Sequence, residues 1–249
     1  MLLEGGLGMV DFKLLNRWMN ASRTFIVFCV FFVFSVSISQ ADTLVGGRIS
    51  SDTIWDLAGS PYIVTSTLQV YGEDYSSATL TIEAGVEVRF DPTVSIEIGS
   101  RLDADIQEGV GALIVIGTSG SPVLFTNNSN ASIWGQMIFH DSTDDRTTRL
   151  EYASIDCSSG LYFYAASPSL KNCIIENVRN ISAAFWLMSS NAIFEEVEIT
   201  TYSKYGIMLP GSSPTITGGS LTNQHPEGEG IFGGVAPKIT DFTISLASS

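Results

Sequence analysis

Charged residues are scarce in this chain. Asp, Glu, Lys and Arg make up 15% of its 249 residues, against 45% for the hydrophobic set. Such low charge excludes a disordered tail and a coiled coil, and the 23 glycines follow no collagen-like triplet spacing. The composition is that of a turn-rich globular protein with one or two domains.

Basic residues, histidine and cysteine are also few. The chain has 12 Lys and Arg against 26 Asp and Glu, a formal net charge of −14. A chain this acidic repels phosphate backbones, so no nucleic-acid partner is expected. The two histidines, His140 and His225, and the three cysteines show no metal-ligand spacing, and neither a G-x-S-x-G elbow nor a P-loop occurs. We therefore expect no metal site and no cofactor from these motifs.

Residues 1–41 have the character of a leader. Lys13, Arg17 and Arg23 precede an apolar run at 24–38, which is followed by Ser39-Gln40-Ala41. This order predicts a secretory signal peptide, since a membrane anchor needs about 20 apolar residues. Met19 begins a leader of ordinary length, so residues 1–18 are interpreted as a possible misassigned upstream start. Without the leader's two acidic and three basic residues, 24 acidic and nine basic residues remain, a net charge of −15.

The second half of the chain repeats itself. The second residues of four similar segments, SPSL, SNAI, SPTI and APKI, fall at positions 168, 191, 214 and 237. Each segment is followed by a polar pair and then an apolar residue, in turn Ile175, Ile199, Leu221 and Ile244. Pieces this short, rich in β-branched residues and turn formers, predict strands rather than helices. A period of about 23 residues with three short strands indicates a coil that stacks on its neighbours about 4.8 Å away.

The first half follows the same plan less regularly. Segments 80–90 and 94–98 alternate apolar and polar residues, and 112–118, 121–126 and 134–139 form further strand-like pieces. No linker separates the two halves. The sequence therefore predicts one all-β domain over 42–249, a right-handed parallel β-helix with three strands per coil.

A family resemblance rests on four segments that precede the SPxI coils. They are TIW…SPYIV, LTIEAGVEVRF, GALIVIGT…SPVLFT and WGQMIF…LEYASI. Over about residues 50–245 the chain resembles the secreted bacterial right-handed β-helix proteins of the pectin-lyase-like superfamily. The resemblance implies the fold and an extracellular or periplasmic location. It implies no single reaction, because this architecture carries lyases, hydrolases, adhesins and non-catalytic surface proteins, and no catalytic motif matches residue by residue.

Strand alternation assigns an outward-facing column. If Leu161 and Phe163 point inward, then the outward residues in successive coils are Ile138, Tyr162, Trp186, Met208 and Phe232, with His140, Tyr164, Met188 and Pro210 beside them. An apolar stripe of this kind favours a contact surface for a sugar or a protein partner. A stabilising stack covered by a loop is the alternative interpretation.

The same alternation assigns the core. Leu170, Ile193, Ile216 and Ile239 are predicted to form one buried ladder. Cys173 falls in a second inward column, so it is expected to be a buried thiol with no disulfide to Cys157.

One acidic loop is a candidate site. Asp141, Asp144 and Asp145 lie together with Arg146 and Arg149 beside them, and the resemblance to pectate-lyase-like enzymes implies that such a set can hold Ca²⁺ and a base. A solvated turn between coils is the simpler interpretation. We therefore expect no catalytic residue, with these three aspartates as the candidates and Ca²⁺ as the only cofactor alternative.

Taken together, the sequence predicts an exported, non-catalytic β-helix protein that binds a polysaccharide or another cell-surface component. The alternatives are a polysaccharide lyase or hydrolase, and a structural spacer or adhesin fragment. Membrane contact is expected only through an uncleaved leader. The last unit supplies residues 236–244 and then no third strand, so a truncated chain or end-to-end self-association is also predicted.

Overall fold

The computed structural model describes residues 42–100, 109–129, 133–180 and 182–247. These residues belong to one compact unit, residues 40–249. The predicted signal peptide at 1–41, with the possible upstream start at 1–18, lies outside the described residues. Within the described part of the chain, no helix combines the length and apolar character needed to cross a membrane.

The described residues form 21 strands and one short 3₁₀ helix, Leu57–Gly59. The strands stack in three parallel columns, here called A, B and C. Column A contains β2 (Thr53–Trp55), β4 (Ser77–Glu83), β7 (Val110–Ile116), β10 (Arg149–Glu151), β13 (Ser169–Lys171), the first part of β16 (Ile193–Thr201) and of β18 (Thr215–Asn223), and β20 (Lys238–Thr240). Column B contains the first part of β1 (Thr43–Ile49) and of β3 (Tyr62–Val70), then β5 (Glu87–Phe90), β8 (Val123–Asn127), β11 (Ala153–Asp156), β14 (Ile174–Val178), the ends of β16 and β18, and β21 (Thr243–Leu246). Column C contains the ends of β1 and β3, then β6 (Ile96–Ile98), β9 (Met137–Phe139), β12 (Leu161–Tyr164), β15 (Ala183–Met188), β17 (Tyr205–Leu209) and β19 (Glu229–Gly233).

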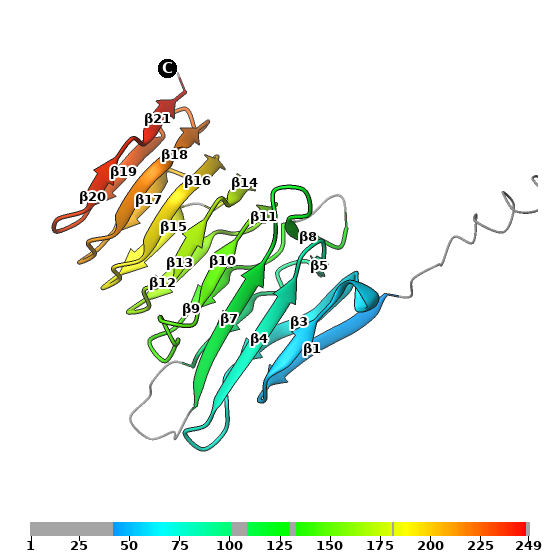
Figure 1. Cartoon of the computed structure of the whole chain (residues 1–249). Helices are drawn as coiled ribbons and strands as arrows, with labels where there is room; N and C mark the ends of the chain where they lie inside the picture. The colour runs from blue at the N-terminus through cyan, green and yellow to red at the C-terminus, as the bar shows by residue number, and fades with distance from the viewer. Residues whose placement is uncertain (1–41, 101–108, 130–132, 181, 248–249) are drawn as a thin grey trace, which may run out of the picture. The chain divides into compact units, whose positions relative to one another are not determined.

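The chain visits A, B and C in turn and then begins the next coil one strand further along (Figure 1). A parallel pairing between each strand and its equivalent in the next coil is the pattern of a β-helix. The predicted fold class, a right-handed parallel β-helix, is confirmed.

The interior is filled by columns of like residues. Ile175, Ile199 and Leu221 stack in column B as predicted, and all three are buried. Phe139 and Phe163 stack in column C with ring centroids 5.1 Å apart. Each buried side chain rests on its equivalent in the neighbouring coil, so apolar area is removed from water along the whole axis.

The expected ladder through Leu170, Ile193, Ile216 and Ile239 is wrong at one residue. Leu170 pairs with Phe194, which pairs in turn with Ile216. Ile193 lies opposite Ser169 and is 44% exposed. The uniform spacing of 23 does not hold here, and a shift of one residue moves a side chain to the opposite face of its strand. Ile239 does continue the ladder but is 42% exposed in β20.

The turn from column A to column B contains a residue in the left-handed region. Its φ is 51° at Tyr152, 52° at Asn172, 51° at Glu196 and 65° at Gly218, and in the β18 coil Gly219 adds a second one at φ 83°. One such residue reverses the side that the following strand buries, and it keeps columns A and B close together.

The two cysteines of the described chain are free thiols. Cys173 is buried between coils, and burial raises its pKa to about 11. Its Sγ donates to the carbonyl of Leu150 at 3.4 Å. Cys173 therefore acts as a small core residue.

Candidate functional site

The predicted outward column is in register. Ile138 pairs with Tyr162, Tyr162 with Trp186, Trp186 with Met208, and Met208 with Phe232. We call these five residues, with Tyr164 and Met188 beside them, the outer strip. The five paired residues lie one in each of five successive coils of column C, and Tyr164 and Met188 add a second residue in two of these coils.

Aromatic rings hold the centre of the outer strip together. The rings of Tyr162 and Trp186 are stacked, with centroids 6.1 Å apart and planes 9° apart. Tyr164 lies beside Tyr162 at 6.0 Å. At the other end, Phe232 contacts Tyr205 at 4.8 Å.

Exposure varies along the outer strip. Tyr162 is only 8% exposed, whereas Met188 and Phe232 are 40% and 45% exposed. The Tyr162 hydroxyl accepts a hydrogen bond from Asn180 Nδ2 at 2.8 Å, and burial raises the pKa of Tyr162. The covered-stack interpretation therefore applies to Tyr162, while Trp186, Met188 and Phe232 leave apolar area accessible.

Trp186 carries an unpartnered donor. Its indole Nε1 is buried and has no hydrogen-bond partner within the described residues. Buried indole N–H groups usually find a partner. Trp186 therefore packs on its neighbours while its indole N–H has no hydrogen-bond partner among the described residues. A tryptophan with only a structural role would normally have one.

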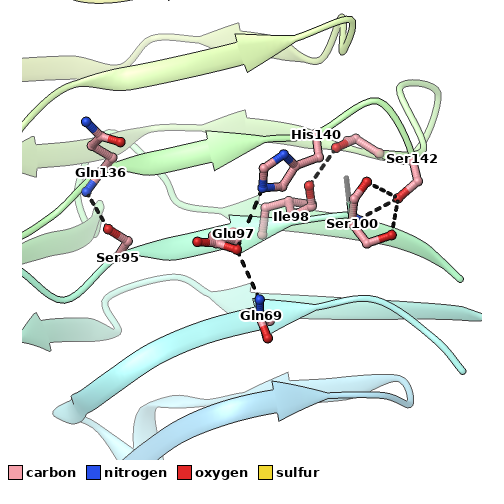
Figure 2. Close-up of polar contacts among 9 residues, drawn as sticks. Gln69, Ser95, Glu97, Ile98, Ser100, Gln136, His140 and Ser142 are labelled. Carbon is pink, nitrogen blue, oxygen red and sulfur yellow. Dashed lines mark hydrogen bonds and ion pairs between the residues drawn. The ribbon is translucent and has the colours of Figure 1, made fainter. Parts of the chain in front are cut away.

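A polar cluster continues the outer strip by two coils. Glu97 on β6 lies opposite Ile138, and Gln69 on β3 lies opposite Glu97. Gln69 Nε2 donates to Glu97 Oε2 at 3.1 Å, and His140 Nε2 lies 3.7 Å from the same oxygen (Figure 2). The imidazole also stacks on Tyr164, with centroids 6.1 Å apart. Polar and aromatic parts of the surface are therefore in direct contact.

The environment keeps Glu97 ionised. The neighbouring His140 imidazole, and with it the hydrogen bond from Gln69, lowers the pKa of the Glu97 carboxyl in spite of its partial burial. The side chains of Glu97 and His140 are 25% and 14% exposed. An ionised carboxylate of this kind accepts hydrogen bonds well and is unsuited to act as a general acid at neutral pH.

Buried hydroxyl groups fix the segment that carries His140. Ser142 Oγ donates to the carbonyl of Ser100 at 3.0 Å and accepts from the Ser100 amide at 2.6 Å (Figure 2). Thr143 Oγ1 donates to the carbonyl of Ile98 at 2.9 Å. The backbone amide of His140 itself donates to the Ile98 carbonyl at 2.9 Å. The imidazole is therefore held over β6 by a rigid loop.

Sequence reasoning placed His140 beside the outer strip but did not predict Glu97 and Gln69. The signal was present: continuing the column C register by one coil from Ile138 reaches Glu97 in the alternating segment 94–98. The contact itself depends on how two coils lie side by side, which the alternation alone does not give.

The acidic loop serves local structure. Asp144 accepts a hydrogen bond from Thr147 Oγ1 at 2.6 Å and one from the Arg146 amide at 3.1 Å, and the Thr147 contact lowers its pKa. Asp145 accepts from the Ser167 amide at 2.6 Å, and burial raises its pKa. These two carboxylates therefore face different partners. The third candidate, Asp141, begins the same loop. Within the residues that the structure describes, no group of three or more His, Cys, Asp or Glu side chains is placed to hold a metal ion.

A groove of about 580 Å³ runs over the outside of column B. Its apolar floor includes Leu124 and Ile174, which are 39% and 46% exposed, and Glu196 and Glu198 line it as well. Tyr152 and Asn172 of the A-to-B turns form its wall. The groove was not among the sites predicted from the sequence.

Comparison of the chain with protein-family models, with curated proteins and with solved structures found no match.

Proposed function

We propose that this chain is an exported, non-catalytic β-helix protein of the pectin-lyase-like kind that binds carbohydrate along the outer strip. The observation that carries the proposal is the contact between the aromatic part of the strip and the Gln69–Glu97–His140 cluster, made through the stacking of His140 on Tyr164.

A sugar presents apolar C–H faces and hydroxyl groups to the same surface. Aromatic and apolar side chains such as Trp186 and Met188 suit the C–H faces. The Glu97 carboxylate and the Gln69 amide suit hydroxyl groups, because charge-assisted hydrogen bonds to them are strong. A strip with both kinds of group in successive coils fits an extended oligosaccharide better than a compact small molecule.

Export is part of the proposal and is supported by the sequence of residues 1–41. The net charge of −15 for the remaining chain disfavours a nucleic-acid partner. The partner is then a polysaccharide or another component of the cell surface.

A screen of neutral and acidic polysaccharides tests the proposal with purified residues 42–249. Binding is followed by isothermal titration calorimetry, and cleavage by the release of reducing ends. We expect binding without cleavage. Trp186→Ala and Met188→Ala should weaken it, while Ile54→Ala serves as the matched control, since Ile54 is an exposed apolar residue on column A, outside the outer strip and the groove.

Cleavage that is lost on chelation or in Asp144→Ala would overturn the non-catalytic proposal in favour of a lyase or hydrolase. Binding to none of the polysaccharides would favour a structural spacer. Equal binding by the Trp186→Ala and Ile54→Ala variants would show that the outer strip is not the binding site.

A further inference from the structure

A second surface lies at the edge between columns B and C. It is a shallow hollow of about 420 Å³. It is lined by Arg179, Asn180, Tyr202, Lys204 and His225. Arg179 and Asn180 follow β14, Tyr202 and Lys204 follow β16, and His225 follows β18, so three successive coils contribute.

Two cations of the hollow have no carboxylate partner. Within the described chain neither Arg179 nor Lys204 forms an ion pair. By contrast, four other bases each pair with a glutamate: Arg48, Arg89, Arg149 and Lys171. Of the eight basic residues that the structure describes, Arg146 and Lys238 also form no ion pair, whereas Arg179 and Lys204 line the same hollow.

Aromatic rings position both cations. The Arg179 guanidinium lies 5.9 Å from the ring centroid of Tyr202, and Lys204 Nζ lies 5.2 Å from that of Tyr205. A cation over a ring face is held in place while its N–H groups stay available to a ligand. The charged groups of Arg179 and Lys204 are therefore partly held in position before a ligand binds.

The third donor is His225. Its Nδ1 accepts a hydrogen bond from the Glu227 amide at 3.1 Å, which assigns the ring hydrogen of a neutral imidazole to Nε2. The backbone amide of His225 donates to Asn223 Oδ1 at 3.0 Å. Asn223 is fully buried, and its Nδ2 donates to the carbonyls of Ser203 and Glu229 at 3.0 and 2.9 Å. The turn that carries the imidazole is thus fixed to the coil beneath it.

The hollow adjoins the outer strip. Asn180 Nδ2, on its wall, donates to the Tyr162 hydroxyl at 2.8 Å. Lys204 lies over Tyr205, whose ring contacts Phe232. A ligand that lies along the strip therefore has the hollow within reach of its substituents.

From this arrangement we infer that the hollow binds a tetrahedral oxyanion, a phosphate or sulfate group, held by Arg179, Lys204 and His225. The guanidinium fork and the ammonium group are the side chains that proteins use for such anions. The donors that line the hollow come from three coils, each about 4.8 Å from the next. A tetrahedral oxyanion offers more oxygens to such a set of donors than a carboxylate, which offers two.

The natural carrier is a phosphate or sulfate ester of a sugar, and this part of the inference rests on the proposed carbohydrate-binding function. The anion site itself does not depend on it. The overall negative charge repels anions at long range, so binding must come from these local contacts and should weaken as salt is raised.

The test is calorimetric titration of purified residues 42–249 with inorganic phosphate, inorganic sulfate, glucose 6-phosphate and galacturonate at low ionic strength. We expect phosphate and sulfate to bind, galacturonate to bind more weakly, and the sugar phosphate to bind most tightly. Arg179→Gln and Lys204→Gln should each weaken phosphate binding about tenfold or more. Lys238→Gln, which changes an exposed lysine on β20, should have no effect.

Thermal unfolding of each variant within a degree or two of the parent separates a lost contact from a lost fold. Equal phosphate binding by the parent and the Arg179→Gln/Lys204→Gln double variant would overturn the inference, as would galacturonate binding as tightly as phosphate. Phosphate binding without any polysaccharide binding would leave the anion site standing and the proposed function refuted. Polysaccharide binding that depends on Trp186, with no phosphate or sulfate binding, would support the proposed function and refute the anion site.

Discussion

Tyr162 and Trp186 lie directly opposite each other on β12 and β15, with ring planes 9° apart. They are 24 residues apart in the chain and one strand apart in space. The tyrosine is 8% exposed and the tryptophan is half-buried, so one surface feature contains both a packed and an accessible ring. Because of this difference in exposure, substitution of Trp186 should affect binding, and substitution of Tyr162 should affect stability.

Replacing the accessible ring should affect binding more than folding. Trp186→Ala removes the stacking contact, which is worth about 0.5–1.5 kcal/mol beyond area, so unfolding should shift modestly while polysaccharide affinity falls. Trp186→Phe should restore part of the affinity. Trp55 and Trp134 are buried, so quenching of tryptophan fluorescence by added ligand reports on Trp186. A variant that melts far lower and still binds normally would show that Trp186 is only a packing residue.

Removing the hydroxyl group of the packed ring should lower the stability of the fold. Tyr162→Phe removes the hydroxyl that accepts from Asn180 Nδ2, and we expect a loss of about 1 kcal/mol in the free energy of unfolding. Urea denaturation monitored by circular dichroism measures it. Tyr164→Phe is the control, because Tyr164 is less buried. Equal effects of the two substitutions would contradict a specific role for the Asn180 contact.

The corrected core register yields a matched pair of substitutions. Phe194→Ala should cost about 3–5 kcal/mol, because Phe194 is 2% exposed and its removal leaves a cavity. Ile193→Ala should cost well under half as much, because the Ile193 side chain is 44% exposed. Chemical denaturation compares them directly. A larger loss from Ile193→Ala would restore the uniform spacing of 23 that the sequence suggested.

The lowered pKa of Glu97 predicts an acid dependence of stability. A carboxylate whose pKa is lower in the folded than in the unfolded chain stabilises the fold at pH above the unfolded value. That contribution is lost as the pH falls from about 4.5, the ordinary glutamate value, through the lower folded value. Glu97→Gln should therefore flatten the acid side of the stability profile relative to the parent.

Glu83→Gln, which changes an exposed glutamate on β4, should leave that profile unchanged. Denaturant unfolding at a series of pH values from 3 to 7 provides the comparison. Parallel profiles for the parent and the Glu97→Gln protein would mean that the contacts of Glu97 with His140 and Gln69 do not stabilise the fold.

Much of the fold was readable from the sequence. In column C the short apolar pieces that begin at Gly160, Ala184, Gly206 and Gly230 mark one strand per coil. Strand alternation assigned Leu161 and Phe163 to the interior and Tyr162 to the outside, as the pairings confirm. The register failed at Ile193, where the coil length departs from the average. Alternation within one strand is local, whereas the step between coils depends on the length of three turns.

The sequence by itself determined the all-β solenoid, its three columns and the residues of the outer strip, because stacked coils repeat one local pattern of burial. Only the tertiary structure decided which of those residues are accessible, which carboxylates are engaged in turns, and that Glu97 meets His140 while Arg179, Lys204 and His225 share one hollow. These features join side chains from different coils. Their distances depend on the lateral placement of each coil on the next and on the direction of each side chain, and neither is encoded in the spacing of residues along the chain.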